Sequence, residues 1–177
     1  MVVATPSDES ETRLLLSTCY QYPGPASVRY PRGAGCGAAE SAGLETVEVG
    51  RGVVRREGRK IAILGFGTLV SAALAAADKL DATVADMRFV KPIDRELILD
   101  LAARHDALVT LEDASIMGGA GSAVLETLSA AGVQTPVLQL GLPDAFIDHG
   151  DQSALLAGIG LDAAGIERSI RARYADL

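Results

Sequence analysis

The hydrophobic pattern changes most clearly between residues 61 and 80. Residues 61–64 form an uninterrupted apolar run, which is typical of a strand covered on both faces. Gly65 and Gly67 end this run, and apolar residues then recur at helical spacing over residues 68–79. A buried strand, a glycine turn and an amphipathic helix make up the first two-thirds of a βαβ unit, so the pattern predicts a parallel sheet covered by helices.

The same alternation of strand and helix continues to the end of the chain. Further strands are predicted at residues 82–86, 107–111 and 137–140. One helix is predicted directly after Asp94, which can cap it. Further helices are predicted at residues 122–131 and 153–157, and at residues 163–174 after the cap Asp162.

The start of this region is interpreted as a hairpin. Residues 53–56 and 60–64 would pair around Glu57-Gly58, with the first strand antiparallel at one edge of the sheet. Residues 88–92 are interpreted as a loop. The predicted fold class is therefore α/β: an open, mostly parallel sheet of about four parallel strands plus one antiparallel edge strand, with helices on both faces.

Residues 1–33 show a shorter pattern. Strands are predicted at residues 2–4 and 27–30, on either side of a helix for which Ser7 is a suitable N-cap. Two strands and one helix cannot cover their own faces, and both edges of the strand pair would be open. We therefore expect this partial βαβ segment to be the end of a larger domain whose body lies upstream. A small appendage docked on the main domain is an equal alternative on length alone.

The domain division follows from these patterns. Residues 1–33 are predicted to be the incomplete end of one domain, and residues 53–177 a complete α/β domain. Residues 34–52 are rich in Gly and Ala and have no sustained period, so they are predicted to be a linker.

Charge and cysteine content exclude several classes of protein. A net charge of −7 argues against a nucleic-acid surface. Residues 61–77 carry no charge, but two glycines divide them and argue against a membrane span. Cys19 and Cys36 are isolated, so neither a metal site nor a disulfide framework is expected, and a reducing, cytoplasmic location fits.

The glycines between residues 65 and 67 raise the alternative of a nucleotide-binding loop. They follow a strand and open a helix, and Asp86 lies about where a ribose-binding acid would be expected. However, Val70 replaces the third glycine of the motif, and a strand-to-helix turn needs small residues for steric reasons alone.

Other polar groups follow the later strands. Residues 118–121, Gly-Gly-Ala-Gly, could receive an anion at a helix start, although close packing against the sheet is favoured. Glu112 and Asp113 lie at the carboxyl end of a strand, where open α/β sheets place function, and could equally solvate a loop or pair across an interface. His105 and His149 have no partner spacing, so neither is proposed as a base.

Arg29 and Arg32 form the most suggestive group. They lie at the carboxyl end of a short strand, beside Pro31 and Gly33, and arginine offers a planar, permanently charged fork for a phosphate monoester. The alternative is that both arginines lie on the surface and form ion pairs with the acidic residues of the linker.

Five segments together resemble a known family. They are ATPSDESE, SVRYPRG, DMRFVKPID, LVTLEDASIMGGAGSAV and LGLPDAFIDHG. In this order and spacing they resemble the carboxyl-terminal part of transketolase-family synthases that join pyruvate to glyceraldehyde 3-phosphate, and the resemblance covers about residues 2–170. It implies three α/β domains. The first binds the diphosphate and Mg²⁺ of thiamine diphosphate, the second holds its pyrimidine ring, and the third serves packing and dimer contact.

The resemblance also implies specific roles for this chain. It would supply the end of the second domain and all of the third, with Arg29 gripping the substrate phosphate and Arg32 as a weaker candidate. No position matches the family's catalytic, cofactor-binding or metal-binding residues, and no role is carried over to His149. We therefore expect a part of a homodimeric enzyme that is inactive by itself. The alternatives are a free-standing, non-catalytic dimerisation module and the nucleotide-binding protein considered above.

Overall fold

The computed structural model describes residues 1–39 and 43–175. The elements, in chain order, are β1 (Val2–Ala4), α1 (Glu9–Gln21), β2 (Ala26–Val28), β3 (Val53–Arg56), β4 (Ile61–Phe66), α2 (Val70–Leu80), β5 (Thr83–Asp86), β6 (Phe89–Lys91), α3 (Arg95–Arg104), β7 (Ala107–Ser115), α4 (Ala120–Ala130), β8 (Val137–Leu142), α5 (Gln152–Gly158) and α6 (Ala163–Arg173). None of the helices among the described residues has the length and apolar character needed to cross a membrane.

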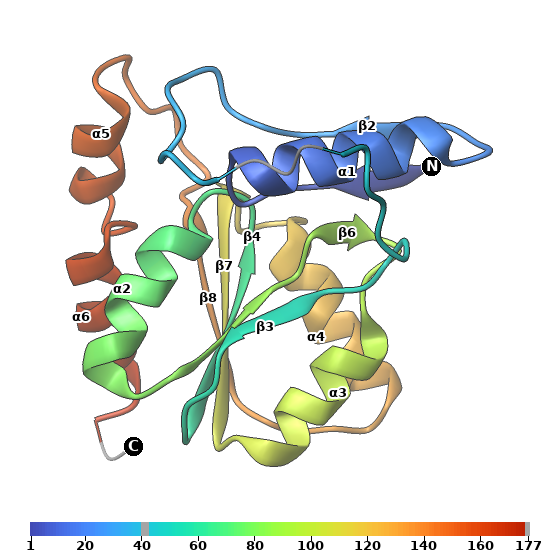
Figure 1. The fold of residues 1–177 in the computed structure, drawn as a ribbon. Helices are drawn as coiled ribbons and strands as arrows, with labels where there is room; N and C mark the ends of the chain where they lie inside the picture. The colour runs from blue at the N-terminus through green and yellow to red at the C-terminus, as the bar shows by residue number, and fades with distance from the viewer. Residues whose placement is uncertain (40–42, 176–177) are drawn as a thin grey trace.

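Most of the chain, residues 53–175, is built around a five-stranded sheet and is called the body below. The strand order is β3-β5-β4-β7-β8, in which β5, β4, β7 and β8 are parallel and β3 is antiparallel to β5. Helices α2 and α6 cover one face of this sheet, and α3 and α4 cover the other (Figure 1). This architecture confirms the predicted α/β class with four parallel strands and one antiparallel edge strand.

Strand β4 shows why the uninterrupted apolar run belongs at the centre of the sheet. Every residue of β4 is buried. Ile63 packs into the apolar cluster under α2 and α6, whereas Leu64 and Phe66 pack into the cluster under α3 and α4. Because successive side chains point to opposite faces, both faces must be covered for such a sequence to be stable.

The predicted hairpin between residues 53–56 and 60–64 is wrong in its pairing. The helical crossover through α2 places β5 directly beside β4, and β3 then pairs with the outer edge of β5. The connection from β3 to β4 passes the start of β5, where the Gly58 amide donates to Thr83 Oγ1 at 2.9 Å. A Cβ at Gly58 would lie 2.3 Å from the carbonyl carbon of Ala82, so this crossing needs glycine.

The amino-terminal unit, β1-α1-β2, belongs to a second sheet with the order β2-β1-β6. Strands β1 and β2 are parallel, as a βαβ segment requires, and β6 pairs antiparallel with the other edge of β1. The interpretation of residues 88–92 as a loop is therefore wrong, and so is the expectation that both edges of the pair are open. Strand β6 has only three residues, which is too short for a hydrophobic period to show.

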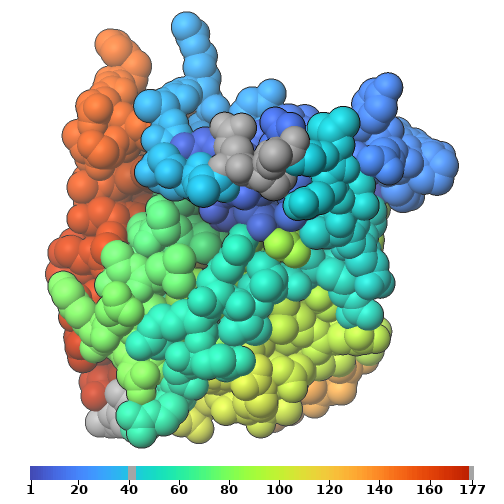
Figure 2. Space-filling view, in the orientation of Figure 1, coloured from blue at the N-terminus to red at the C-terminus, as the bar shows by residue number. Residues whose placement is uncertain are grey.

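The amino-terminal unit lies across one end of the body. In the space-filling view, the blue unit and the light-blue segment that follows it cover the upper end of the green body (Figure 2). Asp8, rather than Ser7, caps α1 by accepting a hydrogen bond from the Glu11 amide at 2.8 Å. The predicted caps Asp94 and Asp162 are confirmed. The division into an incomplete domain, a linker and a complete domain stays a prediction.

Candidate functional site

The amino-terminal unit meets the body at the carboxyl ends of β5 and β7. Strand β5 ends at Asp86, whose side chain reaches Ser7, and the last part of β7 carries Asp113, whose side chain reaches Arg29. Open α/β sheets place their functional groups at this end of the strands. The contact region between unit and body is therefore the candidate site, and its charged residues, together with Ser7, are called the seam. They are Ser7, Glu11 and Arg29 from the unit and Arg55, Asp86, Arg88 and Asp113 from the body.

Arg29 follows β2 directly and points to the body. Its Nη1 donates to the Asp113 carboxylate, and its Nη2 donates to the Asp113 backbone carbonyl at 2.9 Å. The Arg29 side chain is 50% exposed, whereas that of Asp113 is only 16% exposed. The structure therefore brings together two groups that the sequence singled out separately. The interpretation of Asp113 as a residue that pairs across an interface agrees with this contact.

Glu112 faces the start of α4 rather than Arg29. Its two carboxylate oxygens accept hydrogen bonds from the Ala120 amide at 2.7 Å and the Gly121 amide at 2.9 Å. Burial raises the pKa of Glu112, and these two hydrogen bonds act in the opposite direction. A Cβ at Gly119 would lie 2.3 Å from the Ser115 carbonyl oxygen. Gly119 and Gly121 therefore serve close packing, whereas Gly118 has a φ of +73° and no close neighbour, and a side chain of the protein already occupies this helix start.

The other predicted residues lie apart from the Arg29–Asp113 pair. Arg32 is exposed and makes no hydrogen bond or ion pair with any described residue, and His149 is also exposed. His105 is buried. Its Nδ1 donates to the Leu101 carbonyl at 2.8 Å, and its Nε2 therefore accepts from the Thr83 hydroxyl at 2.7 Å. His105 accordingly joins α3 to β5, which is a structural role.

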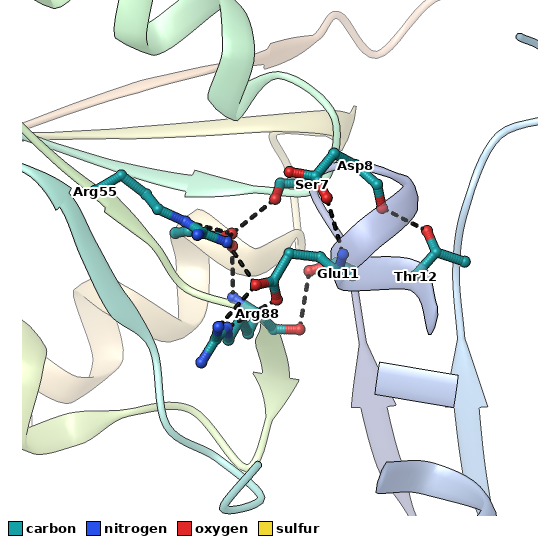
Figure 3. A network of polar contacts seen from close by, with 8 residues as sticks. Ser7, Asp8, Glu11, Thr12, Arg55 and Arg88 are labelled. Atoms are coloured by element: carbon teal, nitrogen blue, oxygen red, sulfur yellow. Dashed lines mark hydrogen bonds and ion pairs between the residues drawn. The ribbon is translucent and has the colours of Figure 1, made fainter. Parts of the chain in front are cut away.

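The sequence did not predict the ionic cluster around Glu11 (Figure 3). The Glu11 carboxylate accepts hydrogen bonds from Arg55 Nη2 at 2.6 Å and from Arg88 Nε at 2.8 Å and Nη2 at 2.7 Å. Asp86 accepts from Ser7 Oγ at 2.8 Å and from Arg55 Nη2 at 2.9 Å. Burial raises the pKa of Asp86, although the hydrogen bonds from Ser7 and Arg55 oppose the shift. An acid in the first turn of α1 was the only signal in the sequence.

These contacts argue against the nucleotide alternative. Asp86 is fully buried and already bonded to Ser7 and Arg55, so it is not available to a ribose hydroxyl. A Cβ at Gly65 would lie 2.6 Å from Val70 Cγ2, and Gly67 has a φ of +83°. The steric interpretation of this turn therefore accounts for both glycines.

A groove of about 570 Å³ lies between α1 and the residues that follow Arg29. Its lining includes Thr12 and Arg13 of α1, Tyr30 and Pro31 after β2, and Gln152 at the start of α5. The groove therefore begins at the residue that follows Arg29, and Arg29 itself is not among its lining residues. Within residues 1–39 and 43–175, no three His, Cys, Asp or Glu side chains converge in a way that could hold a metal ion.

Comparison with known proteins gives consistent results. Residues 50–166 match the family described as the transketolase, C-terminal domain. The chain is 81% identical over its whole length to the 1-deoxy-D-xylulose-5-phosphate synthase of Bordetella parapertussis and 60% identical to that of Thiobacillus denitrificans. It spans only 28% and 29%, respectively, of the length of these relatives.

Solved structures show the same relationship. A split-gene transketolase, described as an inactive β4 tetramer, matches 97% of this chain with a TM-score of 0.81 and 34% identity, and the match covers 56% of that protein. A transketolase variant from Pichia stipitis matches 98% of the chain with a TM-score of 0.63. At 17% identity, the second match supports the fold alone.

Proposed function

The chain belongs to the family of transketolase C-terminal domains, and on that premise we propose that it serves as the carboxyl-terminal part of a 1-deoxy-D-xylulose-5-phosphate synthase. The observation that carries this proposal is the 81% identity to the Bordetella parapertussis synthase, in an alignment that covers all 177 residues of the chain. The whole enzyme would join pyruvate, after decarboxylation, to glyceraldehyde 3-phosphate.

Within that enzyme, Arg29 would bind the phosphate of glyceraldehyde 3-phosphate, and Arg32 would add a second, weaker contact. The geometry supports Arg29 because its guanidinium is held in place by Asp113 while its side chain remains half exposed, and the next residue, Tyr30, lines the groove. Arginine binds phosphate in a planar, bidentate manner and stays charged at every physiological pH. A fixed guanidinium would orient the aldehyde end of the substrate toward the reacting centre.

The cofactor would be held by other parts of the enzyme. The described residues offer no cluster of donors that fits the Mg²⁺ of a metal–diphosphate site, so thiamine diphosphate and Mg²⁺ belong with the upstream domains in this proposal. When bound there, thiamine diphosphate supplies the carbanion chemistry of the reaction. This chain would contribute substrate orientation, domain packing and contact with a second copy of the enzyme, and it would be inactive alone.

The test is an exchange between close relatives. The carboxyl-terminal 28% of the Bordetella parapertussis synthase is replaced by this chain, and turnover of pyruvate with glyceraldehyde 3-phosphate is measured. We expect the chimera to be active and the chain alone, supplied with thiamine diphosphate and Mg²⁺, to give no product. Product from the chain alone, or a folded chimera without activity, would contradict the proposal.

Substitution of Arg29 in the chimera tests the phosphate contact. Arg29→Ala should raise the KM for glyceraldehyde 3-phosphate by about 10- to 100-fold, the range expected for a charged hydrogen-bonded contact, and leave the KM for pyruvate unchanged. Arg104→Ala is a matched control, because Arg104 pairs with Asp100 and Glu57 away from the site. An unchanged KM for glyceraldehyde 3-phosphate in Arg29→Ala would refute the role of Arg29.

A second candidate function is a free-standing, non-catalytic dimerisation module. The observation that favours it is the completeness of the body, whose sheet has an apolar cluster on each face. Size-exclusion chromatography of the whole chain and of residues 50–177 separates the two proposals. A stable dimer that persists without residues 1–49, together with an inactive chimera, would favour the module.

A further inference from the structure

We propose that Asp113 is a positioning residue that holds the Arg29 guanidinium by one edge and leaves the other edge open for a substrate phosphate. This inference rests on the proposed phosphate-binding role of Arg29 and assigns a function to a body residue that contacts no substrate itself. It also explains why a phosphate-binding arginine forms an ion pair within the protein.

Asp113 contacts only one of the two donor edges of the Arg29 guanidinium. A guanidinium has an end edge, formed by Nη1 and Nη2, and a side edge, formed by Nε and Nη2. Arg29 uses Nη1 for the Asp113 carboxylate and Nη2 for the Asp113 carbonyl, so the Asp113 contact occupies the end edge. The side edge keeps the Nε proton and the second Nη2 proton, and no described residue accepts a hydrogen bond from Arg29 Nε. Two parallel N–H groups of this kind match two phosphate oxygens.

Both ends of the contact are fixed by the fold. On the body side, the neighbouring Glu112 is anchored to the Ala120 and Gly121 amides at the start of α4. On the unit side, the Arg29 amide donates to the Ala4 carbonyl at 2.8 Å, which ties its backbone to β1. Asp113 therefore links two rigid elements through one side chain, and the open edge of Arg29 takes its direction from both sheets.

The opposite expectation is that Asp113 weakens phosphate binding by neutralising Arg29. Two observations argue against it. A phosphate on the side edge does not compete with Asp113 for the same protons. The Arg29 side chain is also half exposed, so water screens the charge of the carboxylate. The conformational entropy that a long side chain loses on becoming ordered is not reduced by this screening, so holding Arg29 in place beforehand favours phosphate binding. We therefore expect removal of the Asp113 carboxylate to weaken phosphate recognition.

The experiment compares two acceptors in the chimera described above. For each variant, kcat/KM is measured with glyceraldehyde 3-phosphate and with unphosphorylated D-glyceraldehyde, and the ratio reports recognition of the phosphate alone. Asp113→Asn should lower this ratio about tenfold, the effect expected for one charge-assisted hydrogen bond. Asp113→Glu should recover part of the loss. Asp78→Asn is the matched control, because it removes an exposed carboxylate that pairs with Arg56 outside the seam, and it should leave the ratio unchanged.

The outcomes separate this inference from the proposed function. If Arg29→Ala leaves the ratio unchanged, the phosphate-binding role of Arg29 fails. If Arg29→Ala lowers the ratio but Asp113→Asn leaves it unchanged or raises it, Arg29 binds phosphate without help from Asp113, and the present inference is overturned. A double variant, Arg29→Ala with Asp113→Asn, should have the ratio of Arg29→Ala alone, because Asp113 acts only through Arg29.

A measurement on the chain by itself covers the case in which a variant chimera does not fold. The Nε–H signal of Arg29 is followed by NMR while inorganic phosphate is added. It should shift in the natural chain and respond only at about tenfold higher phosphate in Asp113→Asn. An equal response in the two proteins would count against the positioning role.

Discussion

The two sheets of this protein are stabilised in different ways. The sheet of the body is covered on both faces by apolar clusters in which whole strands are buried. The sheet that carries the amino-terminal unit has one small apolar cluster, formed by Val2, Ala4, Leu15, Cys19 and Phe89. The unit is also attached to the body by the backbone pairing of β1 with β6 and by the ionic seam, in which Glu11 lies between two arginines and Asp113 holds Arg29.

This difference indicates which part of the molecule responds to which change. Apolar burial is not weakened by salt screening or by the protonation of single groups, whereas ion pairs and their hydrogen bonds depend on both. The body should therefore respond to changes in side-chain volume, and the amino-terminal unit to changes in charge. The half-exposed Arg29 belongs to the second region, so the proposed phosphate contact depends on the less strongly anchored part of the structure.

The largest effect is expected in the core of the body. Leu64 is fully buried in β4, and Leu64→Ala should lower the free energy of unfolding by about 2–5 kcal/mol through lost burial and the cavity left behind. Urea denaturation followed by circular dichroism measures this loss. Leu16→Ala, at an exposed position of α1, is the matched control and should have little effect. A loss below 1 kcal/mol for Leu64→Ala would contradict the account of the body.

A change of charge should act on the amino-terminal unit instead. Glu11→Gln keeps the volume but leaves Arg55 and Arg88 without their shared carboxylate, which should weaken the attachment of α1 by about 2–3 kcal/mol. Hydrogen exchange should then accelerate for the amides of α1 and remain slow for those of β4. Glu96→Gln removes an exposed partner of Arg51 and should change stability by less than about 0.5 kcal/mol. Equal acceleration in α1 and β4 would show that the two regions unfold together.

The same difference explains what could be predicted from the sequence. The body was predicted because its strands and helices are long enough for their hydrophobic periods to show, as residues 61–64 and 163–174 illustrate. The predicted pairing of β3 was wrong because the turn signal at Glu57-Gly58 is local and carries no information about β5, which reaches the sheet through a helical crossover. Strand β6 was not predicted because three residues are too few to show a hydrophobic period.

The candidate site was predicted only in part, for a related reason. Arg29 stood out because its neighbours form a local motif, and Asp113 because it follows a buried strand. Their contact joins positions 84 residues apart, and no local pattern encodes such a pairing. Glu11 lies in the first turn of α1, where an acid is favoured without any distant partner, and its two arginine partners come from β3 and from the residue before β6.

The seam should also respond to pH through Asp86. Because burial raises its pKa, the folded protein binds this proton more tightly than the unfolded chain does, and this contribution to stability is present at low pH and lost as the pH rises through the folded pKa. Ser7 donates to the carboxylate and acts in the opposite sense. Ser7→Ala should therefore raise the pKa of Asp86 further and lower stability at pH 7 by about 1 kcal/mol.

Carbon NMR of the Asp86 carboxyl group measures this titration directly. Ser153→Ala is the matched control, because Ser153 makes the same kind of hydrogen bond to Asp151 at an exposed position, where that hydrogen bond lowers the pKa of Asp151. The loss of stability in Ser7→Ala should shrink at a pH below the Asp86 pKa. An unchanged or lower Asp86 pKa in Ser7→Ala would contradict the assignment of this hydrogen bond.

Effects of about the size expected for Ser7→Ala are predicted at two helix caps, which allow the same change to be made in both regions. Asp8 caps α1 in the amino-terminal unit, and Asp162 caps α6 in the body, each by accepting a backbone hydrogen bond at 2.8 Å. Asp8→Ala and Asp162→Ala should each cost about 1 kcal/mol, because the lost hydrogen bond is the same.

The two variants should differ in how much of the molecule they destabilise. Asp8→Ala should increase hydrogen exchange in α1 alone, whereas Asp162→Ala should lower the urea midpoint of the body, since Leu161 and Ile166 beside that cap are buried in its core. If both caps affected only the global midpoint, the ionic seam would be as stable as the core, and the distinction between the two regions would be wrong.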